Sequence, residues 1–216
     1  MRSEPMQPNP KPASRLANVF WLLGLVSFLA SAFYPTNLAS YVSAEGSSRA
    51  PRTAHFVERY ARYVNPVLQV AIPVLLRDRE GMVELVKVAI ATTLGTQVLK
   101  HALNNVHVMG TRLGERPNPY PDRPLRNFAD ANFNMPSGHS SMASCSAYFI
   151  SRRYGWKWAL IVVPIMLLTM FARFSLDKHT LSAVIAGALL GILMTAIFTT
   201  RYRKPAPAAR SPEKGH

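Results

Sequence analysis

LANVFWLLGLVSFLASAFY, residues 16–34, is the stretch that decides the fold class, because its nineteen positions carry no charged side chain. A helix of that length can cross the hydrocarbon core of a bilayer, which is roughly 30 Å thick. Five further apolar runs follow, at residues 66–76, 81–99, 142–150, 158–172 and 181–199. The sequence therefore predicts an all-α integral membrane bundle of six transmembrane helices.

Two of these runs are short for a membrane span. Residues 66–76 and 142–150 must borrow flanking residues, such as 60–65 and 137–141, to reach both membrane surfaces. A short run alone is also explained by a buried helix of a water-soluble protein, but six runs in 216 residues leave too little polar chain to cover them in water. Ala30-Ser31-Ala32 has the form of a signal-peptidase site, yet a long segment precedes the first run, so we expect that run to be retained.

The chain is strongly basic, with 25 Lys and Arg against 11 Asp and Glu and a formal charge of +14. Such an excess of positive charge is typical of proteins that bind either nucleic acid or an anionic membrane surface. With six spans, the basic clusters before the first run, after the second and fourth, and at the tail share one side, which the positive-inside rule assigns to the cytoplasm. Further basic residues then lie on the opposite side, which excludes nucleic acid as the partner.

Three parts follow from this topology. We expect a disordered cytoplasmic N-terminus at residues 1–14, a membrane domain at 15–200 and a basic cytoplasmic tail at 201–216. Apolar residues between 54 and 64 recur at helical spacing, with Glu58, Arg59 and Arg62 on another side. This pattern predicts an interfacial amphipathic helix, which we interpret as an anchor in preference to a lipid-facing gate.

Asn134-Met135-Pro136-Ser137-Gly138-His139 lies where an outer loop ends and a membrane helix begins. Pro136 suits entry into a helix, Ser137 can cap its free N–H groups, and Gly138 lets an anion approach the backbone. Such a helix N-terminus predicts a phosphate or oxyanion site within reach of His139. Taken alone, the motif is equally well explained by an ordinary helix cap beside an interfacial histidine.

Two further elements fall on the same predicted side of the bilayer. Arg173 and His179 lie between the fifth and sixth runs, while Lys100 ends the third run and Arg116 follows in the loop. Guanidinium groups bind phosphate with a planar fork, and the lysine ammonium acts as a point charge. Cationic groups kept together near membrane level on the translocated side indicate a site for a large anion.

These residues resemble the type 2 phosphatidic acid phosphatase superfamily, whose pattern is Lys…Arg-Pro, then Pro-Ser-Gly-His, then Ser-Arg-x5-His-x3-Asp. The matching residues are Lys100 with Arg116-Pro117, then residues 136–139, then Arg173 with His179. Within that superfamily, residues 55–62, 112–117 and 132–142 look like the lipid A 1-phosphatases of Gram-negative bacteria.

The chain departs from the superfamily pattern in three places. Fifteen residues separate Lys100 from Arg116, more than is usual, and Ala172 replaces the serine. Ala183 stands where the superfamily has the aspartate that orients the nucleophilic histidine. Asp177 or a backbone carbonyl are the candidates to replace that carboxylate.

The resemblance implies a metal-independent phosphatase without a cofactor, in the bacterial inner membrane, with its active site facing the periplasm. His179 would attack phosphorus to form a phosphohistidine, and His139 would protonate the leaving oxygen and then activate water. The groups that would hold the phosphate oxygens are Lys100, Arg116, Arg173, the Ser137 hydroxyl and the Gly138 N–H.

The resemblance implies the 1-phosphate of lipid A as substrate, and its removal would weaken the binding of cationic antimicrobial peptides. The same groups would serve undecaprenyl pyrophosphate or phosphatidylglycerol phosphate, or pass the phosphoryl group to a second lipid instead of water. A different alternative, motivated by Ala183, is a non-catalytic membrane protein that binds anionic lipid.

Overall fold

The computed structural model describes residues 12–33, 51–117 and 132–203. Most of the predicted disordered N-terminus and basic tail therefore lies outside the described residues. In chain order the elements are α1 (Pro12–Phe33), α3 (Arg52–Arg59), the 3-10 turn η1 (Ala61–Tyr63), α4 (Val64–Leu75), α5 (Arg79–Leu103), β1 (His107–Val108), β2 (Thr111–Arg112), α7 (Gly138–Tyr154), the 3-10 turn η2 (Trp156–Trp158), α8 (Ala159–Ser175) and α9 (Leu181–Phe198). A helix forms at each of the six apolar runs.

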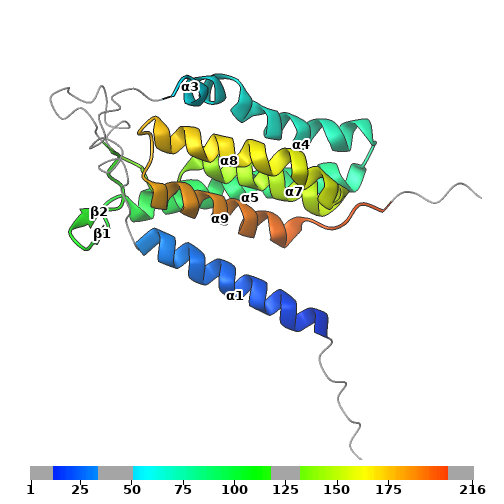
Figure 1. Ribbon diagram of the computed structural model, residues 1–216. Coiled ribbons are helices and arrows are strands. Elements are labelled where there is room, and N and C mark those ends of the chain that lie inside the picture. The colour runs from blue at the N-terminus through cyan, green and yellow to red at the C-terminus, as the bar shows by residue number, and fades with distance from the viewer. Residues whose placement is uncertain (1–11, 34–50, 118–131, 204–216) are drawn as a thin grey trace, which may run out of the picture.

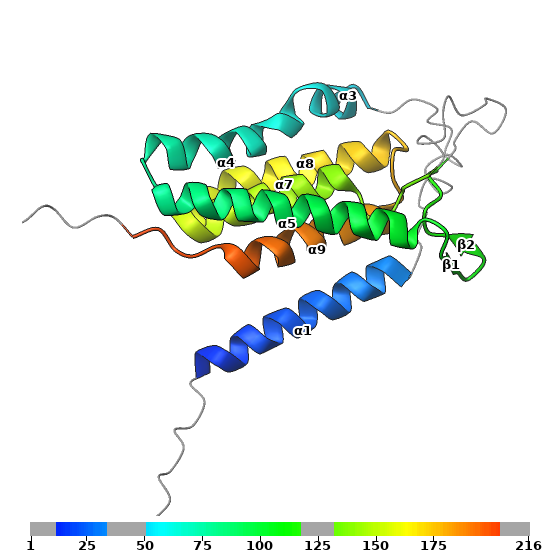
Figure 2. The ribbon, with the colours of Figure 1, turned by 180° about the vertical axis from the view of Figure 1, so that it is seen from behind.

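Five helices, α4, α5, α7, α8 and α9, lie side by side as a bundle, and α7 packs against each of the other four (Figures 1 and 2). Helix α1 contacts α9 and diverges from the bundle towards its own N-terminus. One end of the bundle carries α3, the β1–β2 hairpin and the corner between α8 and α9. The chain beyond α9 leaves at the opposite end.

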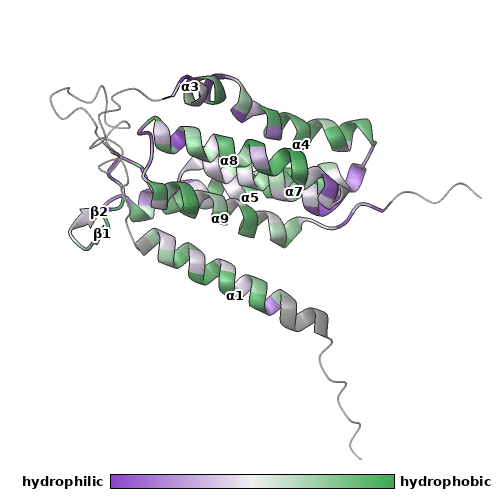
Figure 3. Ribbon diagram, viewed as in Figure 1, coloured by the Kyte–Doolittle hydropathy of each residue, from purple (hydrophilic) through white to green (hydrophobic). Residues whose placement is uncertain are grey.

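Apolar residues predominate along α1, α4, α8 and α9 in the hydropathy colouring of Figure 3. Large side chains such as Leu75, Val98 and Leu160 are more than half exposed, which suits a hydrocarbon solvent and not water. Within the described residues, three stretches are long and apolar enough to cross a membrane: α5, Trp156–Ser175 and α9. Of the other three helices, α4 and α7 are shorter than these stretches, and the part of α1 whose side chains are described, Ala17–Ala32, is a shorter apolar helix. The count of six spans therefore stays a prediction.

Small residues let α9 approach the start of α7 closely. A Cβ atom added at Gly187 would lie 2.3 Å from the Ser137 carbonyl oxygen, and one at Gly191 would lie 2.2 Å from the Ser141 carbonyl oxygen. Glycine thus brings the two backbones into direct contact, as small residues do between membrane helices. This contact fixes where α7 begins.

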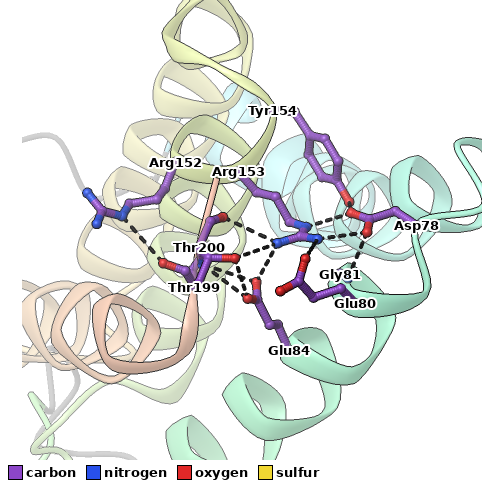
Figure 4. Close-up of polar contacts among 9 residues, drawn as sticks. All are labelled: Asp78, Glu80, Gly81, Glu84, Arg152, Arg153, Tyr154, Thr199 and Thr200. Atoms are coloured by element: carbon purple, nitrogen blue, oxygen red, sulfur yellow. Dashed lines mark hydrogen bonds and ion pairs between the residues drawn. The ribbon is translucent and has the colours of Figure 1, made fainter. Parts of the chain in front are cut away.

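The opposite end of the bundle is closed by a buried ion cluster around Arg153 (Figure 4). Its guanidinium donates to both carboxylate oxygens of Asp78 and, at 2.9 Å, to Glu84. The hydroxyl of Thr200, just beyond α9, donates to Glu84 at 2.7 Å. The cluster therefore joins the α4–α5 turn, the end of α7 and the chain that follows α9.

A short amphipathic helix, α3, forms within the segment where the sequence predicts one. Ala54 and Val57 are buried against Ala172 of α8, while Phe56 and Tyr60 are exposed. The polar residues do not share one face as expected, because Arg59 is exposed and Glu58 and Arg62 turn inward. The position of α3 at a membrane surface stays a prediction.

Candidate active site

The ends of several helices bring the predicted site residues to one end of the bundle (Figure 1). Lys100 lies in the last turn of α5 and Arg173 in the last turn of α8, while His139 lies in the first turn of α7. His179 lies in the corner that links α8 to α9. Segments distant in sequence therefore converge, as the sequence predicts.

His179 is the most enclosed of these groups, with 2% of its surface exposed. Its Nδ1 lies 2.8 Å from the backbone carbonyl oxygen of Asn134. A carbonyl accepts only, so Nδ1 carries the proton, and in the neutral ring the lone pair is then on Nε2. Burial lowers the pKa of His179 well below its usual value, and the positive charges of Arg173, Lys100 and Arg116 lower it further.

Asn134 positions the corner that carries His179, a role that the sequence analysis does not assign. Its side-chain oxygen accepts from the Thr180 N–H at 3.0 Å, and its side-chain nitrogen donates to the Thr180 hydroxyl at 3.0 Å. That hydroxyl in turn accepts from the Ala183 N–H, as the cap of α9. The side chain and carbonyl of one residue thus fix both the histidine ring and the start of the next helix.

The carboxylate missing at Ala183 is replaced by this carbonyl. Ala183 is fully buried in an apolar cluster with Leu113, Met135 and Ala186, and its own carbonyl accepts from the Ser137 N–H at 2.8 Å. Asp177 adopts a left-handed conformation with φ of 51°, which aspartate tolerates in tight turns. Burial raises the pKa of the Asp177 carboxyl. The geometry assigns Asp177 to the turn, and the acceptor at Nδ1 is the Asn134 carbonyl.

The start of α7 supplies backbone donors beside Lys100. Ser137 is the N-cap residue, but the side-chain cap that the sequence predicts does not form, and its hydroxyl instead accepts from Ser140 at 3.1 Å. Gly138 faces Lys100, since an added Cβ would make ordinary contact with its Cε at 3.9 Å. Lys100 donates to the carbonyl of Phe133 at 2.7 Å. An anion placed here would meet both the helix N-terminus and the ammonium group.

Two charged residues of α3 and η1 also reach the site, and the sequence analysis did not place them there. Arg173 donates to Glu58 at 2.6 Å, and Arg62 donates to the same carboxylate oxygen at 2.7 Å. The same Nη1 atom of Arg62 lies 3.1 Å from Nε2 of His139. The i,i+4 spacing of Glu58 and Arg62 was the available signal, but it suits a solvent-exposed pair equally well.

Comparison with known proteins identifies the family of this chain. The family model described as PAP2 superfamily matches residues 82–206. The chain is 43% identical over 150 residues to the Lipid A 1-phosphatase of Helicobacter pylori (strain ATCC 700392 / 26695), covering 69% of this chain and 73% of that protein. It is 33% identical over 138 residues to the Lipid A 4'-phosphatase of Helicobacter pylori (strain J99 / ATCC 700824), covering 64% of this chain and 66% of that protein.

Among solved structures, the chain is similar to the transmembrane PAP2 type phosphatidylglycerolphosphate phosphatase from Bacillus subtilis. The identity is 18% and the TM-score 0.46, over 86% of this chain and 87% of that chain. The family assignment rests instead on the family model, which spans more than half of the chain and includes Lys100, His139 and His179. The motif resemblance is confirmed: the chain belongs to the PAP2 superfamily.

Proposed function

We propose that this chain is a membrane lipid phosphatase that removes the 1-phosphate of lipid A. The observation that carries the chemistry is the enclosed ring of His179, with Nδ1 held by the Asn134 carbonyl and with Lys100, Arg116 and Arg173 near enough to lower its pKa. A phosphate monoester is the anion that such a group of cations suits, and phosphoryl transfer needs mainly positioning and neutralisation of charge.

The tautomer of His179 supports its role as nucleophile. With the Nδ1 proton held by the Asn134 carbonyl, Nε2 offers its lone pair to phosphorus. The N–P bond forms as the bond from phosphorus to the leaving oxygen breaks, and His139 supplies the proton that this oxygen takes up. Water, deprotonated by His139, then attacks the phosphohistidine and releases inorganic phosphate and the histidine.

The substrate part of the proposal is supported by the curated relatives. Identity of 43% to a Lipid A 1-phosphatase exceeds the 33% identity to a Lipid A 4'-phosphatase, so the 1-position is favoured. The active site would face the periplasm of the bacterial inner membrane, on the side opposite the basic clusters. Removal of phosphate there would leave a less anionic surface for cationic peptides.

A non-catalytic anionic-lipid-binding protein is the second candidate, and the missing aspartate at Ala183 is the observation in its favour. The Asn134 carbonyl weakens that case, because it fixes the tautomer of His179 without a carboxylate. A neutral acceptor stabilises the imidazolium less than aspartate does, which favours a slower enzyme over an inactive one.

The test is phosphate release by the purified, detergent-solubilised protein in EDTA, with lipid A, undecaprenyl pyrophosphate and phosphatidylglycerol phosphate as substrates. We expect release from the 1-position of lipid A, and a loss of about 1,000-fold or more for His179→Ala. His107→Ala is the matched control, because His107 is exposed on the β1–β2 hairpin.

Each other outcome removes a different part of the proposal. Preference for another lipid would leave the chemistry and reject lipid A. Unchanged release by His179→Ala would reject the nucleophile, and loss of activity in EDTA that added metal restores would reject the metal-independent mechanism. Lipid binding without release would favour the binding protein.

A further inference from the structure

Glu58 occupies the position that an anionic ligand would take between two arginines of the site. Its Oε1 accepts from Nη1 of Arg173 and from Nη1 of Arg62, at 2.6 and 2.7 Å. Its Oε2 is buried and has no hydrogen-bond partner among the described residues. An oxygen shared by two guanidinium groups is the arrangement that arginines make with a phosphate oxygen.

The arginines that hold Glu58 are not saturated by it. Within the described part of the chain, the Nε atoms of Arg62 and Arg173 are also buried without a hydrogen-bond partner. Buried donors of a charged group are costly to leave unpaired, so these arginines favour a ligand whose oxygen atoms reach the Nε positions that the Glu58 carboxylate leaves unpaired. A phosphate group has three equatorial oxygens.

Arg62 also acts on the second histidine of the site. A guanidinium group has no acceptor, so its 3.1 Å contact with His139 requires that Nε2 accept and carry no proton. Nε2 of His139 therefore has no proton to give to a leaving oxygen while Arg62 remains in contact. Catalysis through this nitrogen requires that Arg62 move to another partner.

We propose that Glu58 is an internal counter-ion that occupies the phosphate site when no substrate is bound, and that Arg62 is a further phosphate ligand. This inference rests on the proposed phosphatase site. The incoming phosphate displaces Glu58 from Arg173 and Arg62, and Arg62 leaves Nε2 of His139 as it turns to the phosphate. Nε2 of His139 is then free to take up a proton from water, and the protonated ring is the acid that the leaving oxygen needs.

Glu58 and Arg62 come from a segment that precedes the part of the chain matched by the family model, which begins at residue 82. α3 and η1 are nevertheless fixed to the bundle, because Ala54 and Val57 are buried against Ala172, the neighbour of Arg173. The charged pair is therefore held at the site by packing and is not a chance contact of a loose loop.

The experiment measures binding of inorganic phosphate to the purified full chain in detergent by isothermal titration calorimetry, at constant ionic strength and without turnover. Glu58→Gln keeps the size of the side chain and removes the competing charge, so we expect phosphate to bind about tenfold more tightly. Arg62→Gln should bind it about tenfold more weakly, and Arg62→Lys should recover part of the loss. Arg59→Gln, an exposed neighbour on α3, is the matched control.

The direction in which Glu58→Gln changes the phosphate affinity shows whether Glu58 is a counter-ion or a residue that positions Arg173. Unchanged or weaker binding by Glu58→Gln would overturn the proposal, because Glu58 would then support Arg173 and not compete with phosphate. Unchanged binding by Arg62→Gln, or no binding by any of the proteins, would overturn it too. If lipid hydrolysis fails but these affinities shift as expected, only the proposed function is rejected.

Discussion

At the scale of single residues, the acceptor beside His179 determines how the ring titrates. A carboxylate would favour the imidazolium form, whereas the carbonyl of Asn134 carries no full charge to offset burial and the nearby cations. The folded chain therefore keeps His179 neutral at pH values where a free histidine is protonated. In the proposed role of nucleophile, His179 would need no deprotonation step at neutral pH.

This predicts a specific titration in the folded protein. Below about pH 6.5 the unfolded chain binds a proton at this position and the folded chain does not, so His179 lowers stability as the pH falls towards its depressed pKa. NMR of ¹⁵N-histidine-labelled protein in micelles, with His179→Gln for assignment, should show a ring that stays neutral and Nδ1-protonated below the pH at which free histidine takes up a proton. A midpoint at or above 6.5 would contradict the burial argument.

Ala183 supports a second prediction, because it is tempting to restore the superfamily aspartate there. The Ala183 side chain is fully buried among apolar groups, so a carboxylate at this position would lose its hydration. It would gain no hydrogen bond from Nδ1 of His179 in return, because Nδ1 already donates to the Asn134 carbonyl. Ala183→Asp should lower stability by about 1–3 kcal/mol and give no gain in kcat. Thermal unfolding and lipid A turnover test both parts; faster turnover would show that the carbonyl is an inadequate substitute.

At the scale of elements, the sequence predicts the helices well and the inward polar contacts poorly. Apolar runs mark the helices because each must satisfy its backbone hydrogen bonds internally in a membrane. The Pro-Ser-Gly-His motif and the Arg-x5-His spacing also lead to one end of the bundle, where His139, Arg173 and His179 lie together. By contrast, the inward turn of Glu58 depends on how Ala54 and Val57 pack on α8, and a charge pattern within one helix does not encode that rotation.

The contact of α9 with the start of α7 makes Gly187 a critical position. A methyl group there would meet the carbonyl oxygen of Ser137 at 2.3 Å, and backbone cannot rotate away as a side chain can. Gly187→Ala should destabilise the protein by about 1–3 kcal/mol through overpacking and lower turnover by shifting the α7 N-terminus.

Gly95→Ala is the matched control for this substitution. An added Cβ at Gly95 would make only ordinary contact with Leu190, at 3.8 Å. We expect no loss of stability, since alanine favours the helix by up to about 1 kcal/mol over glycine. Equal melting temperatures of the two variants would show that the α7–α9 contact is not restrictive.

At the scale of the whole molecule, the two ends of the bundle hold opposite electrostatic arrangements. The active-site end gathers cations and leaves donors for a ligand, whereas the far end saturates Arg153 with Asp78 and Glu84. Tyr154 adds a hydrogen bond to Asp78 at 2.9 Å. The first arrangement suits binding of an exchangeable anion, and the second suits a permanent closure of the helix ends.

Breaking the ion cluster around Arg153 is therefore predicted to change the stability of the protein without changing its catalytic activity. The Arg153 side chain is fully buried, and Arg153→Met would leave the carboxylates of Asp78 and Glu84 without their cation. Loss of one partner from a buried pair costs about 3–5 kcal/mol. Arg152→Met is the control, expected within about 0.5 kcal/mol, because Arg152 is exposed and its Nε makes only a long hydrogen bond of 3.5 Å to the Thr199 carbonyl (Figure 4).

The role of the Arg153 charge can be tested by the pH dependence of the free energy of unfolding. The Arg153 hydrogen bond holds the pKa of Asp78 below its usual value, so its contribution to stability is present above about pH 3.9 and is lost as the pH falls through the folded pKa. In Arg153→Met the buried carboxylates lack a counter-charge and take up protons more readily when folded, so acid stabilises the variant. The stability difference from wild type should narrow between pH 7 and pH 4 in denaturant unfolding, while lipid A turnover per folded molecule at pH 7 stays near wild type. A constant difference across that range would show that Arg153 acts through packing alone.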